Sequence, residues 1–220
     1  SGDLRRFLNY VEIASSMSKI LDGKILKITT DGLWEIIPEI GYSEDTHFDL
    51  LSAMIKSIRG SDPDAALIWC FKLVKSGFPV EDIFRRLFVS ASEDIGNAFP
   101  DALTFVNAGY NAFVNVGLPE GLINLAHVVT LLASAPKSNR SYLSCQNVQS
   151  FLEKNDPYPP KNIRQHPAGY KYPFDYGDFV LQNYADTQEL FYRPSSFGFE
   201  AKIKERLERI WKGKKNYGQE

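Results

Sequence analysis

Between residues 45 and 153 the chain repeats one pattern, in which a helix-length stripe of apolar residues is ended by a glycine or a proline. Within each stretch the apolar residues recur three and four positions apart, the spacing that places them on one face of an α-helix. The turns between the stretches are short, which favours antiparallel neighbours. The pattern therefore predicts an all-α fold, a helical bundle or array, and no fixed-period sequence repeat accompanies it.

Residues that start and stop helices divide this region into its expected elements. We expect Gly60 to end one helix, while Asp62 caps the next and Pro63 suits its first turn. The stretch over residues 118–136 is more uniformly apolar than its neighbours, which predicts a central helix buried on most sides. His127 lies in that stretch and is expected to be a core histidine with its hydrogen bonds satisfied.

An irregular segment is expected over residues 155–198, where prolines and tyrosines alternate. Proline cannot continue a helix, so the segment is predicted to be irregular, with a short strand pair left open. Its aromatic side chains are costly to leave in water, so we expect the segment to pack across the bundle. A last helix follows at about residues 199–212, and residues 193–220 hold eight basic and four acidic residues, a net charge of +4.

The overall charge and the cysteines limit the class of protein. The formal net charge is −2 over 220 residues, so any contact with DNA must come from a local basic patch. Cys70 and Cys145 lie in helix-like apolar patterns, which favours a reducing compartment over a disulfide-linked scaffold. No run approaches the roughly 20 apolar residues of a membrane span, and no signal peptide precedes the first helix. We therefore expect a cytoplasmic protein with no membrane partner.

The sequence lacks the motifs that carry enzymatic chemistry. There is no GxxxxGK[ST] phosphate loop, no GxGxxG, no GxSxG and no CxxC or HExxH metal pair. Glu93 and Asp94 are adjacent, so they point in different directions from a helix, and we expect either to pair with Arg85 or Arg86 or to be solvated. The histidines lie far apart in the sequence, at His47, His127 and His166. The sequence predicts no catalytic residue and no metal site.

The first residues, SGDLRRFLN, open a predicted helix with the pattern Gly-Asp-x-Arg. This resembles the sensor 2 motif of AAA+ ATPases, whose arginine contacts nucleotide phosphates through its fork of donors. Further stretches resemble the C-terminal part of the replication-associated recombination protein A family, the MgsA group of bacterial clamp-loader-like AAA+ ATPases related to Werner-helicase-interacting protein. In chain order these stretches are THFDLLSAMIKSIRGSDPDAALIW, SASEDIG, GLPEG, APKSNRSYL, AGYKYPFDY and FYRPSSFGFEAKIKERLERI.

The resemblance implies two domains, residues 1–42 as the C-terminal part of a AAA+ lid and residues 43–220 as a helical domain like the clamp-loader collar. It implies that Arg5 is a nucleotide-binding sensor 2 residue and that ATP and Mg are cofactors of the full-length protein. The chain itself should hold no cofactor and hydrolyse no ATP, because it lacks Walker motifs. A DNA-dependent ATPase for replication-fork maintenance, recombination and repair is implied as the parent. The implied partners are a homotetramer, DNA and single-strand-binding protein, in a bacterial, nucleoid-associated location.

Two functions remain open from the residues themselves. The first is oligomerisation, because several helix faces carry more large apolar side chains than one chain is expected to bury. These are Trp69, Phe71, Phe84, Phe88, Phe105 and Phe113.

The second function is a DNA- or replication-protein-binding helical module with a basic aromatic surface, on which tyrosines stack against bases and cations hold phosphates. Packing against the bundle is the favoured alternative for those tyrosines. The candidate contact residues are Lys137, Arg140, Lys171, Tyr172, Arg193, Lys202, Arg206, Arg209 and Lys212.

Overall fold

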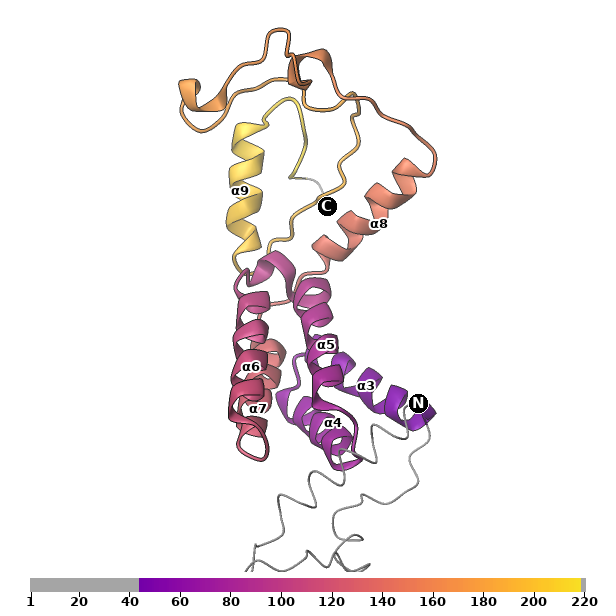
Figure 1. The fold of residues 1–220 in the computed structure, drawn as a ribbon. Helices are drawn as coiled ribbons and strands as arrows, with labels where there is room; N and C mark the ends of the chain where they lie inside the picture. Colours follow the sequence, from indigo (N-terminus) through magenta and orange to yellow (C-terminus); the bar gives the residue numbers. More distant parts are fainter. Residues whose placement is uncertain (1–43, 219–220) are drawn as a thin grey trace, which may run out of the picture.

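The computed structural model describes residues 44–218, and all regular structure in that range is helical (Figure 1). This confirms the predicted all-α class. The expectations for residues 1–42, among them the lid boundary and Arg5, lie outside the described residues. The α-helices are α3 (Glu44–Arg59), α4 (Pro63–Lys75), α5 (Val80–Ser90), α6 (Ala102–Val116), α7 (Gly121–Ser134), α8 (Arg140–Leu152) and α9 (Glu200–Ile210). Short helical turns are η1 (Ala91–Ile95, π-helical), η2 (Gly96–Ala98), η3 (Lys161–Ile163) and η4 (Pro173–Tyr176).

Helices α3 to α7 pack around one hydrophobic core, and we call these five helices the bundle. Phe84 is fully buried, and its ring lies 5.3 Å from that of Tyr110 and 5.6 Å from that of Phe113, measured between centroids. Burying a side chain of this size contributes roughly 1.5–3 kcal/mol. Other fully buried core residues are Met54, Ile58, Leu73, Ile83, Leu87, Ile95, Val106, Leu125, Val129 and Leu132. The bundle therefore has a complete core of its own.

The turn between α3 and α4 lies where the sequence predicts it, because α3 ends at Arg59, directly before Gly60. The residue with a left-handed backbone is Ser61, at φ 60°, and not Gly60. The amides of Ser61 and Asp62 donate to carbonyls of the last turn of α3, at 3.1 and 3.0 Å, which closes the helix end in a Schellman arrangement. Asp62 then caps α4 by accepting from the Ala65 amide at 2.9 Å, as predicted.

Helix α7 is central in position, and of its residues only Ile123, His127 and Ser134 are exposed. It packs against α3, α4 and α6 through Leu125, Val129 and Leu132. On its other side Ile123 is 72% exposed and His127 is exposed. The prediction of a core histidine is therefore wrong, whereas most residues of α7 are buried or half-buried, as predicted for a helix buried on most sides. An outward-facing apolar residue cannot be told from a core residue by its identity alone.

Helices α8 and α9 leave the bundle (Figure 1). No residue of α8 is buried, and within the described residues neither α8 nor α9 contributes to the hydrophobic core. The two helices diverge from one end of the bundle, and the irregular segment 155–198 spans from one to the other. We call this segment the arch, and α8, the arch and α9 together the upper lobe. The predicted bundle over residues 45–153 therefore ends near residue 135.

The arch does not pack across the bundle as the sequence predicts. It is held by α9, because the rings of Phe179 and Tyr184 meet the Trp211 ring edge-on at 5.2 and 6.1 Å. An ion pair joins Asp178 to Arg206 of α9 at 2.7 Å. No strand occurs in the arch, all of which the structure describes. Its most exposed rings are Phe174, Tyr158, Phe197 and Tyr176.

Candidate functional site

The bundle and the upper lobe meet at a fully buried carboxylate, that of Glu200 at the start of α9. Its Oε1 accepts a hydrogen bond from the Tyr192 hydroxyl at 2.7 Å, and its Oε2 accepts from the Ser195 hydroxyl at 2.6 Å and from the Ser138 hydroxyl. The Tyr192 oxygen in turn accepts from Nδ2 of Asn97, in η2, at 3.1 Å. We call these five residues the carboxylate junction.

The junction satisfies its buried charge with hydroxyl groups. A buried carboxylate is costly unless it accepts several hydrogen bonds, and here the donors come from three separate points of the chain. Burial raises the pKa of Tyr192, and its hydrogen bond to Glu200 raises the pKa further, so the phenol stays protonated as a donor at neutral pH. Within the described residues no buried side-chain nitrogen or oxygen lacks a hydrogen-bond partner. The junction is therefore a satisfied structural network.

Gly198 lets α9 approach the bundle closely. Its φ is +55°, and a Cβ at this position would lie 2.2 Å from the Ala98 carbonyl oxygen and 2.8 Å from Cγ of Pro136. The next residue, Phe199, donates its amide to the same Ala98 carbonyl at 2.8 Å. Only glycine fits both the backbone conformation and the space.

A charged cleft adjoins the junction. Arg59, in the last turn of α3, donates through Nε to Oδ1 of Asp94 at 2.5 Å and through Nη2 to Oε1 of Glu93 at 3.2 Å. The other oxygen of Asp94 accepts from the Ser90 hydroxyl at 2.8 Å. The hydrogen bond to Asp94 raises the pKa of Arg59. The cleft is therefore lined by paired charges that join α3 to η1.

This pairing corrects the sequence prediction that Arg85 or Arg86 holds Glu93 or Asp94. Arg85 instead pairs with Asp82, one turn earlier in α5. The backbone over residues 91–95 is π-helical, so the directions of its side chains differ from those of a regular α-helix. Both acidic residues of this turn consequently reach the arginine of α3.

Lys137 ties the cleft to the turn between α3 and α4. Its ammonium donates to the carbonyls of Ala133 and Ala135 at 2.9 and 2.6 Å, and to the Ser61 hydroxyl at 3.0 Å. A cation at this place complements the free carbonyls at the end of α7. Burial lowers the pKa of Lys137, and the charge of Asp94 opposes that effect. The three donors of Lys137 are thus used within the protein.

The cleft brings together four of the stretches that carry the family resemblance, SIRGSDPDAA, SASEDIG, APKSN and FYRPSSFGFEA. Sequence reasoning missed Glu200, although a signal was present. Glu200 precedes Ile203 by three residues and Leu207 by seven, so an acid lies on the apolar face of the helix. The residues lining the cleft are Arg59, Glu93, Asp94, Lys137, Ser138, Asn139, Arg140, Tyr142, Ser195 and Phe197.

The predicted DNA-contact residues fall into two groups. Those near the start of α8 or α9 are Lys137, Arg140, Arg193 and Lys202, and those in the arch or near the end of α9 are Lys171, Tyr172, Arg206, Arg209 and Lys212. In the second group Arg206 is paired with Asp178, and the Tyr172 ring contacts Phe174 at 5.3 Å. In the first, the Lys202 ammonium lies 5.8 Å from the centre of the Phe199 ring.

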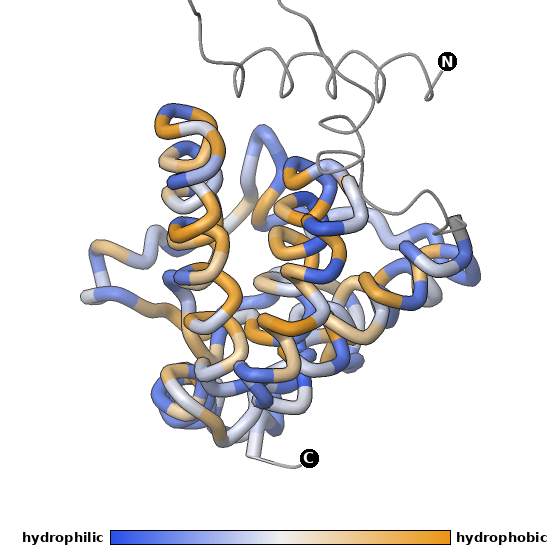
Figure 2. The backbone as a smooth tube through the Cα atoms, turned by 90° about the horizontal axis from the view of Figure 1, so that it is seen from below, coloured by the Kyte–Doolittle hydropathy of each residue, from blue (hydrophilic) through white to orange (hydrophobic). Residues whose placement is uncertain are grey.

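Exposed apolar side chains gather where α6 turns into α7. Four of them are 53–72% exposed, and we call them the α6–α7 face: Val114, Val116, Leu118 and Ile123. A hollow between the two helices, lined by Phe105 and Leu131 among others, lies beside this face. Figure 2 shows strongly hydrophobic stretches along the bundle helices when the molecule is viewed from below. An apolar patch of this kind is typical of an interaction surface.

Within residues 44–218 no group of histidine, cysteine, aspartate and glutamate side chains is arranged to hold a metal ion. No helix of that range is long and apolar enough to cross a membrane. Both cysteines are free thiols, Cys70 in the bundle core and Cys145 on the surface of α8. Burial raises the pKa of Cys70 to about 12.

The fold and the junction define an all-helical domain in which a bundle with its own core carries a smaller upper lobe. Residues 60–211 match the model of the family described as MgsA AAA+ ATPase C terminal. The chain therefore belongs to this family, which confirms the resemblance found in the sequence.

Named relatives agree with this family. Over 227 residues the chain is 33% identical to Replication-associated recombination protein A of Escherichia coli K12, covering 94% of this chain and 51% of that protein. It is 35% identical over 234 residues to the protein of the same name in Bacillus subtilis 168, covering 97% and 55% respectively. ATPase WRNIP1 of Dictyostelium discoideum is 35% identical over 142 residues, covering 64% of this chain and 16% of that protein. The chain spans about half the length of these bacterial relatives.

Proposed function

We propose that this chain is the self-association module of a DNA-dependent AAA+ ATPase that acts in replication-fork maintenance, recombination and repair. The observation that carries the proposal is the α6–α7 face, four large apolar side chains that are 53–72% exposed around the connection between α6 and α7. Family membership and the names of the relatives support the biological setting. The proposed assembly is a homotetramer that resembles a clamp-loader collar.

In this proposal the chain holds subunits in a fixed arrangement and does not itself form or break covalent bonds. The carboxylate junction holds the upper lobe against the bundle, so that the two parts of the chain keep a fixed arrangement in an assembled collar. ATP with Mg would be held by the nucleotide core of the whole protein, with Arg5 contacting the phosphates. DNA and single-strand-binding protein as partners, and a nucleoid-associated location, belong to the same proposal.

The test is the solution mass of the chain, measured by light scattering over a range of protein and salt concentrations. We expect a tetramer, and we expect Val114→Glu with Ile123→Glu to lower the mass, because a charge in an apolar interface is left desolvated and unpaired. Phe174→Glu is the matched control, since Phe174 is 73% exposed in the arch and lies outside the α6–α7 face. A monomer at every concentration, or equal masses for both variants, would overturn the proposal.

A second candidate function is contact with nucleic acid through the upper lobe. The observation that favours it is a cluster of basic side chains at the end of α9, in residues 209–215, with the sequence RIWKGKK. Basic groups beside aromatic rings are the combination with which proteins hold single strands.

A further inference from the structure

We propose that the end of α9 and the adjoining arch form a contact site for single-stranded nucleic acid, built on a lysine ridge between two hollows. The ridge is Lys212, Lys214 and Lys215, and the aromatic part is Trp211 with Tyr184. The proposal deepens the second function above and rests on it. Trp211, Tyr184, Lys214 and Lys215 are residues that the sequence alone did not single out.

The ridge carries positive charge that is not neutralised locally. Residues 209–215 include Arg209 and the three lysines of the ridge and no acidic residue. Arg209, Lys212 and Lys214 are exposed, and no acidic side chain of the described residues forms an ion pair with any of the four. These cations are therefore available to phosphate groups.

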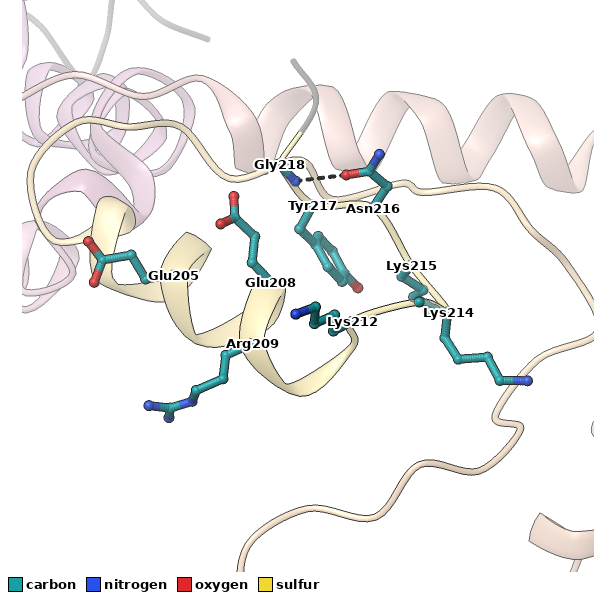
Figure 3. Close-up of a pocket in the computed structure, with 10 residues that line it drawn as sticks. Glu205, Glu208, Arg209, Lys212, Lys214, Lys215, Asn216, Tyr217 and Gly218 are labelled. Carbon is teal, nitrogen blue, oxygen red and sulfur yellow. Dashed lines mark hydrogen bonds between the residues drawn. The ribbon is translucent and has the colours of Figure 1, made fainter.

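The first hollow lies on one side of the ridge (Figure 3). Arg209 and Lys214 point outward on opposite sides, and Lys212 lies between them. Glu205 and Glu208 also line the hollow, and Glu208 is directed toward Gly218. The hollow is lined by four basic and two acidic side chains, so its lining has a net positive charge.

The second hollow has an aromatic wall, and Lys214 and Lys215 line both hollows. Trp211 and Tyr184 lie in this wall with their rings edge to face, 6.1 Å apart. The Lys215 ammonium lies over the Trp211 ring, 4.7 Å from its centre. Aromatic rings and cations therefore share one surface.

Hydrogen bonds within the arch hold the Tyr184 side chain in place. Gln182 donates to the Tyr184 hydroxyl at 2.9 Å and to the Lys171 carbonyl at 2.8 Å, and it accepts from the Lys171 amide at 3.1 Å. Tyr184 is therefore held in place before any ligand binds, which lowers the entropy cost of binding.

The combination of groups favours a single strand over other anionic ligands. A single strand offers phosphates to the ridge and unstacked bases to exposed rings, and base stacking on aromatic side chains is largely independent of sequence. The arch exposes further rings nearby, those of Tyr170, Tyr172 and Tyr176. An acidic peptide or a duplex would use the lysines and leave the rings without a partner.

The first experiment measures binding of a fluorescent oligothymidine to the chain by anisotropy, over a series of salt concentrations. Lys212→Ala with Lys214→Ala and Lys215→Ala should weaken binding about tenfold or more and reduce the slope of log affinity against log salt by about 2, because three phosphate contacts are lost. The matched control removes the same charge elsewhere, through Lys56→Ala, Lys75→Ala and Lys154→Ala. Equal affinities for the two triple variants would overturn the proposal.

A second arm tests the aromatic wall. Tyr184→Ala should weaken binding of the oligothymidine about tenfold with an unchanged salt slope, because a stacking partner is lost and no charge is removed. Tyr184→Phe keeps the ring but loses the hydrogen bond from Gln182, so it should weaken binding much less than Tyr184→Ala does. If polyglutamate or a duplex competes as well as a single strand, and Tyr184→Ala has no effect, the site takes another polyanion and the proposal fails.

The mass of each variant in the same samples separates this proposal from the self-association proposal. If a ridge variant loses oligothymidine binding but keeps the mass of the unchanged chain, the result bears on the ridge proposal and not on the self-association proposal. A chain that binds oligothymidine as a monomer supports the ridge and contradicts the collar.

Discussion

Glu200 occupies a position in α9 at which the helix pattern favours an apolar side chain, since Ile203 and Leu207 follow it on the same face. The structure places its carboxylate among hydroxyls from Ser138, Tyr192 and Ser195, with no exposed surface. An apolar residue here would leave those hydroxyls without their acceptor. Leaving a buried hydrogen-bond donor without an acceptor costs more free energy than a typical intramolecular hydrogen bond contributes to stability.

We predict that Glu200→Ala lowers the free energy of opening α9 by about 2–4 kcal/mol, because two buried serine hydroxyls and the half-buried Tyr192 hydroxyl lose their acceptor. Glu200→Gln should cost less, since its amide keeps one acceptor oxygen and the same shape. Amide hydrogen exchange of α9 measures the change. Glu205→Ala, an exposed acid on the same helix, is the control and should change the free energy by less than about 0.5 kcal/mol. Equal exchange in Glu200→Ala and Glu205→Ala would contradict the role of the junction.

At the scale of the elements, the helices follow from local sequence but several of their partners do not. Apolar spacing and stop residues predicted an array of helices over residues 45–153 and a last helix at about residues 199–212. Helices α3 to α9 lie in these ranges to within one residue, because these signals act within a helix. The same spacing did not show that α8 leaves the bundle, since periodicity marks an apolar face without saying what covers it. The site was less predictable still. Asn97 and Tyr192 are 95 residues apart, and Ser138 and Glu200 are 62 apart.

Helices α6 and α7 lie close together at Gly109. A Cβ there would lie 2.2 Å from Cγ2 of Val128. We predict that Gly109→Ala destabilises the bundle by about 1–3 kcal/mol through overpacking, although alanine favours a helix by about 1 kcal/mol over glycine. Urea unfolding followed by circular dichroism measures this.

Asn111→Ala is the control for that change, because Asn111 is exposed on the same helix and its replacement relieves no contact in the core. It should leave stability unchanged or slightly raised. Combining Gly109→Ala with Val128→Ala should cost less than the sum of the two single changes, since the smaller side chain removes the clash. If the two changes in the free energy of unfolding simply add, the close contact with Val128 is not the reason that glycine is needed at position 109.

At the scale of the whole molecule, the bundle holds the hydrophobic core, and the upper lobe is joined to it by polar contacts at one end. Stability in such an arrangement is not uniform, because the lobe can open without exposing the core. The two cysteines provide a means of observing this. Cys70 is fully buried in the bundle, whereas Cys145 is exposed on α8.

We predict that a thiol reagent modifies Cys145 at once and Cys70 only when the bundle opens. Burial raises the pKa of Cys70 to about 12, so its native thiol stays protonated and unreactive at neutral pH. Glu200→Ala should leave the labelling rate of Cys70 unchanged, because it loosens the lobe alone, while Gly109→Ala should raise that rate by loosening the bundle. Cys70→Ala identifies which signal belongs to which thiol. If Glu200→Ala accelerated Cys70 labelling as much as Gly109→Ala does, the bundle and the lobe would unfold as one unit, and the junction would stabilise the whole chain.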